Sequence, residues 1–90
     1  SDWIRLYPVT PNPCKEQATI RFSLFERTTL SLTVIDALGR PVSLPVVNTA
    51  FSAGDHSLRI PAGNFSPGVH YFVIQSGSGK PMSGKIVKAG

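Results

Sequence analysis

The sequence is poor in charge, in cysteine and in strong helix formers, and each shortage excludes a class of protein. Charged residues make up only 16% of the 90 residues. Lysine and arginine are scattered singly along most of the chain, whereas a nucleic-acid-binding protein clusters them on one element. Cys14 is the only cysteine, so an internal disulfide and a thiolate zinc cage are excluded. Alanine, glutamate, lysine and glutamine together number 14, which predicts that helices are nearly absent.

Long apolar runs and a leader sequence are missing as well. No stretch approaches the roughly 18 continuous apolar residues that a membrane span needs. Residues 1–7 have neither the basic start nor the apolar stretch of a signal peptide. Hydrophobic residues nevertheless make up 41% of the chain, which is too many for a disordered tail. We therefore expect one folded domain over residues 1–90, either cytosolic or part of a longer exported precursor.

The residues that are plentiful belong to strands and turns. Valine, isoleucine and threonine number 20, and glycine and proline number 8 each. Apolar and polar residues alternate in short pieces bounded by turn residues, which predicts strands at residues 3–7, 17–24, 29–36, 40–44, 56–60, 69–76 and 81–88. Pro45 should end the fourth strand, and residues 46–53 are irregular. The strand at 69–76 is apolar on both faces, which indicates a central or covered position.

Seven short strands with regular turn signals are typical of an antiparallel sandwich. The predicted fold is all-β, a seven-stranded antiparallel immunoglobulin-like β-sandwich, with a small barrel as its rival. The prolines at 8, 11 and 13 should form a stiff proline-rich segment over residues 8–13. Gly77-Ser78-Gly79 should turn the chain into the last strand.

No pattern of reactive side chains predicts catalysis. The acidic residues lie beside turns or strand ends, where solvated or backbone-bonding carboxylates are ordinary; they are Asp2, Glu16, Glu26, Asp36 and Asp55. Asp55, His56 and His70 lack the tight spacing of a metal site. No serine lies in a nucleophile elbow and no phosphate loop is complete. We expect no catalytic residue, no metal, no cofactor and no enzymatic activity.

Aromatic residues leave one binding alternative open. Trp3, Tyr7 and Tyr71 could form a flat platform for sugars, as in an adhesion or carbohydrate-binding module. The competing interpretation is that these large side chains are used for burial.

The order of several short motifs carries a resemblance to a known family. The motifs are Leu6-Tyr7-Pro8 with Pro11-Asn12-Pro13, Ala18-Thr19-Ile20-Arg21-Phe22-Ser23-Leu24, Val34-Ile35-Asp36-Ala37-Leu38-Gly39-Arg40, Ala53-Gly54-Asp55-His56, Ser66-Pro67-Gly68-Val69-His70-Tyr71-Phe72-Val73-Ile74 and Gly84-Lys85-Ile86-Val87-Lys88. In this order they resemble the type A C-terminal sorting domain of the Bacteroidetes type IX (Por) secretion system. The immunoglobulin-like domain of flagellar hook-capping proteins shares part of the pattern.

The resemblance implies a function and a set of partners. The chain would be the C-terminal secretion and sorting signal of a larger passenger protein that crosses the periplasm and the outer membrane to the cell surface or the extracellular space. A surface sortase would normally remove it. The implied partners are the type IX translocon, the sortase and the N-terminal passenger of the same precursor, with no nucleic acid and no transmembrane segment. The matching positions are Pro11, Asn12, Pro13, Gly39, Arg40, Gly54, Gly68 and the final motif.

The final motif suggests how a translocon would recognise the domain. A last strand at a sheet edge presents free backbone groups with which a partner can pair, or through which two copies associate weakly. The hypothetical recognition residues are Gly84, Lys85, Ile86, Val87 and Lys88. Ile86 and Val87 would supply apolar contact, and Lys85 and Lys88 a salt-sensitive attraction. The alternative for Ile86 is that it closes the core.

The chain is basic, with a net charge of +4 and no acid after Asp55. This charge favours binding to anionic surfaces.

A structural appendage that stabilises a neighbouring domain is a further alternative to the sorting role.

Overall fold

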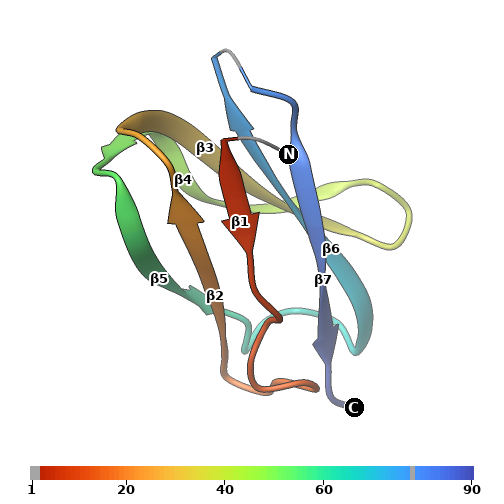
Figure 1. The fold of residues 1–90 in the computed structure, drawn as a ribbon. Coiled ribbons are helices and arrows are strands. Elements are labelled where there is room, and N and C mark those ends of the chain that lie inside the picture. Colours follow the sequence, from red (N-terminus) through yellow and green to blue (C-terminus); the bar gives the residue numbers. More distant parts are fainter. Residues whose placement is uncertain (1–2, 78) are drawn as a thin grey trace.

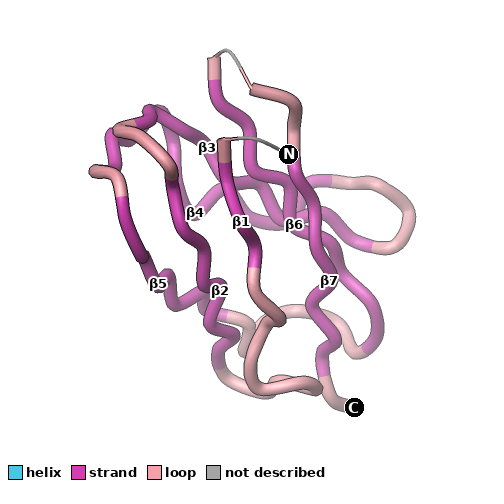
Figure 2. The backbone as a smooth tube through the Cα atoms, viewed as in Figure 1, coloured by secondary structure: helices cyan, strands magenta, loops and turns pink. Residues whose placement is uncertain are grey.

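A computed structural model describes residues 3–77 and 79–90 of the chain. These residues form seven strands and no helix (Figure 2). The strands are β1 (Ile4–Leu6), β2 (Gln17–Leu24), β3 (Thr28–Asp36), β4 (Pro41–Phe51), β5 (Gly54–Pro61), β6 (Gly68–Ser76) and β7 (Met82–Lys88). Asp2, one of the five acids, and Ser78, the centre of the expected Gly77-Ser78-Gly79 turn, lie outside the described residues.

The strands form two antiparallel sheets packed face to face (Figure 1). One sheet has three strands in the order β1-β2-β5, and the other has four in the order β4-β3-β6-β7. The antiparallel sandwich predicted from the sequence is confirmed, and its type is compatible with an immunoglobulin-like fold. The fourth strand pairs with β3, whereas in constant-type immunoglobulin domains the fourth strand joins the sheet of the first two.

The core follows from the alternation of side chains along the strands. In β2, Ala18, Ile20, Phe22 and Leu24 are buried, and the residues between them face outwards. Strands β3, β6 and β7 contribute the opposing layer, which consists of Leu30, Leu32, Val34, Phe72, Ile74 and Ile86. The central position expected for β6 is also found, since it pairs with β3 on one side and β7 on the other.

The prediction for the fourth strand was wrong. Instead of ending at Pro45, β4 continues to Phe51. Proline has no N–H to donate, but an edge strand needs ladder hydrogen bonds on one side only. The edge strand β4 can therefore include Pro45. The register against β3 shifts between Leu30 and Ile35, and such bulges break the alternation on which the sequence prediction depended.

The proline-rich segment does not remain extended as a whole. Thr10 pairs with Thr19 of β2 through two backbone hydrogen bonds, of 3.2 and 2.7 Å. The chain then bends over residues 11–13. This bend brings Cys14 alongside the end of β7, where the two form a parallel bridge.

Gly84 sits beneath the ring of Phe72, its register partner on β6. A Cβ at this position would overlap the Cε2 and Cζ atoms of that buried ring. Because protein interiors are close-packed, the ring cannot move aside without displacing its neighbours. Glycine at 84 is therefore a packing requirement of the β6–β7 pair.

We predict that Gly84→Ala lowers the free energy of unfolding by about 1–3 kcal/mol, the usual effect of overpacking a core. Gly77→Ala is the matched control, because a Cβ there meets no atom within 4 Å. Both changes reduce the conformational freedom of the unfolded chain equally. Urea unfolding of the two variants measures the difference, and equal stabilities would contradict the packing role.

Candidate functional site

The terminal strand β7 lies at one edge of the four-stranded sheet, as expected, but its side chains divide between two roles. Ile86 is 0% exposed and belongs to the core. Gly84 faces the core as well, whereas Lys85 points to solvent and Val87 is half-buried. The alternative prediction, that Ile86 closes the core, is therefore confirmed. In the folded domain Ile86 has no exposed surface that a partner could contact.

Lys88 is engaged within the domain. Its ammonium group donates to the carbonyl oxygens of Ala62 and Gly63, at 2.7 and 3.1 Å. Both carbonyls belong to the loop between β5 and β6, and the N–H of Ala62 donates to the carbonyl of Glu16 at 2.9 Å. Lys88 therefore ties the end of the chain to the β5–β6 loop, which is itself bonded to Glu16.

The backbone around Val87 is also tied down. The N–H of Cys14 donates to the carbonyl of Val87, and the N–H of Ala89 donates to the carbonyl of Cys14, each at 2.8 Å. We call these two bonds and the Lys88 contacts the terminal clasp; the segments that it joins lie together at the lower end of the sandwich (Figure 1). Free cysteines are among the most often buried residues, so the sequence predicts burial of Cys14, and the structure confirms it.

The clasp shortens the free edge of β7. Outward-facing backbone groups alternate along an antiparallel strand, so those between the start of β7 and Val87 belong to Ser83 and Lys85. The free backbone groups expected along the last strand are thus confined to its first half. Two residues offer a short ladder for an added strand.

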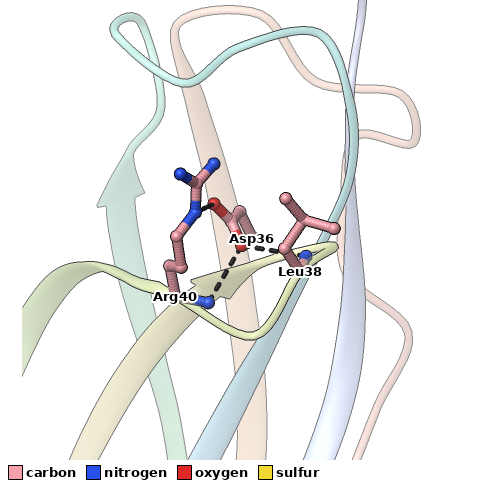
Figure 3. Close-up of polar contacts among 3 residues, drawn as sticks. All are labelled: Asp36, Leu38 and Arg40. Carbon is pink, nitrogen blue, oxygen red and sulfur yellow. Dashed lines mark hydrogen bonds and ion pairs between the residues drawn. The ribbon is translucent and has the colours of Figure 1, made fainter.

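The turn between β3 and β4 is organised by Asp36 (Figure 3). One carboxylate oxygen accepts hydrogen bonds from the N–H groups of Leu38 and Arg40, and the other accepts from Arg40 Nε, all at 2.9 Å. Gly39, with φ of 85°, lies between them. The Arg40 N–H, with its guanidinium and the Leu38 N–H, holds the pKa of Asp36 below the usual aspartate range, against a smaller opposing effect of desolvation. The backbone-bonding aspartate expected beside a turn is confirmed here.

Two further family positions, Gly54 and Gly68, begin β5 and β6. Their φ angles are 114° and 116°. Residues other than glycine rarely adopt this conformation. A Cβ at either position would nevertheless meet no neighbouring atom. The backbone conformation therefore requires glycine at both positions.

The structure does not gather the matching positions into one cluster. Pro11, Asn12 and Pro13 lie in the bend before the terminal clasp. Arg40 and Gly68 line a hollow between the β3–β4 turn, which contains Gly39, and the β5–β6 loop. Gly54 lies at the other end of β2, opposite Leu24.

The aromatic residues considered for sugar binding are separated. Trp3 donates from Nε1 to the carbonyl of Lys80 at 2.9 Å. Tyr7 hydrogen-bonds Ser23 at 3.0 Å, and its ring lies under the guanidinium of Arg21 at 5.1 Å. Tyr71 is on the four-stranded sheet instead. The three rings do not form a common platform.

The histidines have structural surroundings. His70 is buried with its ring stacked on Phe65, centroids 4.9 Å apart. His56 is stacked on Phe22 and its Nε2 lies 2.8 Å from the carbonyl of Ser52. Among residues 3–77 and 79–90, no three His, Cys, Asp or Glu side chains are grouped so that they could hold a metal ion. The same residues include no helix long and apolar enough to cross a membrane.

Comparison with known proteins gives a family and a fold. A family model described as a secretion system C-terminal sorting domain matches residues 8–89. No curated protein matches the chain. Solved structures of a beta-glucosidase from Listeria innocua, in complexes with gluconolactone, isofagomine and glucose, are similar to it with TM-scores of 0.62, 0.61 and 0.59.

The identity to these enzyme structures is 13%, and each match covers 97% of this chain but 16% of the enzyme chain. At this identity the likeness concerns the fold alone. The activity of the glucosidase, of which this chain spans only a small part, is not carried over.

The clasp predicts that the two lysines of β7 differ in their effect on stability. Lys88→Met, which keeps most of the side-chain stem, should lower the free energy of unfolding by about 1–2 kcal/mol, because two carbonyls lose a charged donor. Lys85→Met, on the exposed face, should stay within about 0.5 kcal/mol of the parent. Thermal or urea unfolding compares them, and equal effects would remove the basis for the clasp.

The Asp36 turn predicts a defined dependence on pH. Because the pKa of Asp36 is lowered in the folded state, the turn gains stability above the usual aspartate range and loses it as the pH falls through the lowered value. An NMR titration should show the amide signals of Leu38 and Arg40 moving together, with a midpoint below that range. Asp36→Asn should abolish the transition. A midpoint at the ordinary aspartate value would contradict the assignment.

Proposed function

This chain belongs to the secretion system C-terminal sorting domain family, and we propose that a cell-surface sortase cuts it from its passenger after transport. The domain is a C-terminal sorting signal for type IX secretion. It is part of a larger precursor that this machinery delivers to the cell surface or beyond. The observation that carries the proposal is the extent of the family match, which includes the final strand and nearly all of the chain.

In this proposal other proteins carry out the chemical steps, such as the cut by the sortase. The domain itself is non-catalytic, and the engagement of its acids supports this. Asp36 organises a turn, and Asp55 accepts a hydrogen bond from Ser23 at 2.5 Å. Acid and base catalysis would need two carboxylates to converge, whereas these two are engaged in separate local hydrogen bonds.

Within the proposal the translocon contacts the folded domain at or beside β7. Lys85 remains the exposed charge of the predicted recognition set, since Lys88 is held by the clasp and Ile86 by the core. Deleting residues 84–90 would remove a core residue and the clasp together with Lys85. Substitutions at single exposed positions therefore test recognition better than a truncation does.

The proposal predicts that the domain is sufficient for export of a fused reporter, and that it is then cut from that reporter. A reporter protein fused before Ser1 should reach the surface or medium of a bacterium that has type IX secretion, whereas the reporter alone should stay in the periplasm. Both carry the same periplasmic leader. Mass spectrometry of the delivered reporter should find the domain absent.

A strain without the sortase is the control for cleavage, and it should accumulate the uncut fusion. A reporter delivered with the domain still attached would contradict cleavage while leaving the sorting function intact. A fusion that stays in the periplasm in the presence of the machinery would contradict sufficiency for export.

A further inference from the structure

The two outer faces of the sandwich differ in chemistry. The outer face of the β1-β2-β5 sheet is polar apart from Pro61, which pairs with Gln17 at one end. Register and alternation place on it Arg5, Thr19, Arg21, Ser23, Asp55, Ser57 and Arg59. Such a face is readily solvated. Its side chains also hydrogen-bond one another, as Ser23 does to Asp55.

The outer face of the four-stranded sheet carries a group of apolar residues, bordered by polar ones such as Thr33 and Ser83 beside Val73. In β6, His70, Phe72 and Ile74 face the core, so the alternate residues face outwards. Directly opposed residues on neighbouring strands share a face, and this places Val87 and Lys85 beside β6 on one side and Ile35 on the other. We define the outer patch as Ile35, Val69, Tyr71, Val73, Lys85 and Val87.

The edge strand β4 extends the apolar surface. Leu44 and Val47 are 56% and 54% exposed. Each follows a residue that is paired with a core residue of β3, Ser43 with Val34 and Val46 with Leu32. Alternation therefore turns both side chains to the outer face.

Nothing in the described chain covers this face, because its seven strands are all used in the two sheets. Strands that are apolar on both faces normally occur where both faces are covered. Here Tyr71, in the middle of the patch, is 38% exposed. Contiguous apolar surface of this kind marks an interaction site, and tyrosine is among the residues enriched at such sites.

The charge of the face defines the partner further. Lys85 lies opposite Tyr71. The strands of this sheet contain one acid, Asp36, which is neutralised by Arg40 at 2.9 Å. In a symmetric patch-to-patch dimer both copies would contribute Lys85 to the interface and carry a net charge of +4, so repulsion between like charges opposes it. An acidic partner is favoured instead.

We propose that the outer patch is the docking surface for an acidic, apolar protein surface of the type IX machinery. This docking proposal rests on the proposed function. It makes the outer face of the four-stranded sheet, rather than the free edge of β7, the main contact. The edge offers the backbone of Ser83 and Lys85 alone before the clasp begins, whereas the face offers several apolar side chains on three adjacent strands. Lys85 steers the acidic partner, and Tyr71 and its valine neighbours supply the apolar contact.

The test uses the reporter fusion with substitutions on opposite faces. Lys85→Glu and Arg59→Glu change the net charge equally, at exposed positions on the two sheets. Lys85→Glu should reduce the rate of export by about tenfold or more, which corresponds to ~1.4 kcal/mol of binding. Arg59→Glu should keep the parental rate within about twofold. Tyr71→Ser should reduce export without changing charge.

Thermal unfolding of each variant chain separates docking from folding. The test is judged on the variants that keep the parental Tm within a few degrees, and Lys85→Glu is expected to do so because surface changes cost little. Export of Lys85→Glu and Tyr71→Ser at the parental rate, with the parental fusion exported, would overturn the docking surface and leave the proposed function standing. Failure of the parental fusion itself would count against the function.

Two other occupants of the patch are distinguished by separate measurements. Sedimentation of the parental domain should find a monomer, and a dimer that Lys85→Glu alters would assign the patch to a second copy and overturn the proposal. Thermal unfolding of the reporter in the fusion should be unaffected by Tyr71→Ser. A loss of reporter stability would assign the patch to the passenger, with the same consequence.

Discussion

Closure of the core by the last strand is the constraint on which the rest of this structure depends. Ile86 fills the space between the sheets, Gly84 makes room for Phe72, and Lys88 anchors the end of β7 to the β5–β6 loop. The terminal strand therefore belongs to the core of the domain and is not a separable peptide. Any partner that recognises it in the folded state has to use the residues that alternate away from the core.

The sequence alone predicts most strands because half-buried strands alternate strictly, as β2 does from Gln17 to Leu24. It misplaces the end of β4 because bulges at an edge break that alternation. It also cannot separate Lys85 from Lys88. Both are lysines on one strand near its end, and only the β5–β6 loop, distant in sequence, distinguishes them by offering two carbonyl oxygens to Lys88.

The recognition residues predicted from the last motif are therefore divided by the fold. Gly84, Ile86 and Lys88 stabilise the domain, and Lys85 and Val87 face outwards beside Val69 and Tyr71. The outer neighbours on β6 were visible in the sequence as a strand apolar on both faces. What could not be seen was that the second face is left uncovered by residues 3–77 and 79–90, because this depends on where the other six strands lie.

The likeness to a glucosidase at 13% identity indicates why the surface has to carry the sorting signal. The core of such a sandwich meets general demands of packing, and one fold serves many unrelated functions. Machinery that selects sorting domains from other sandwiches must therefore read features that packing does not require. An outer face with an apolar patch beside a lysine is such a feature, because a free-standing domain gains no stability from leaving Tyr71 and its neighbours in water. The proposed partner would remove this apolar surface from water.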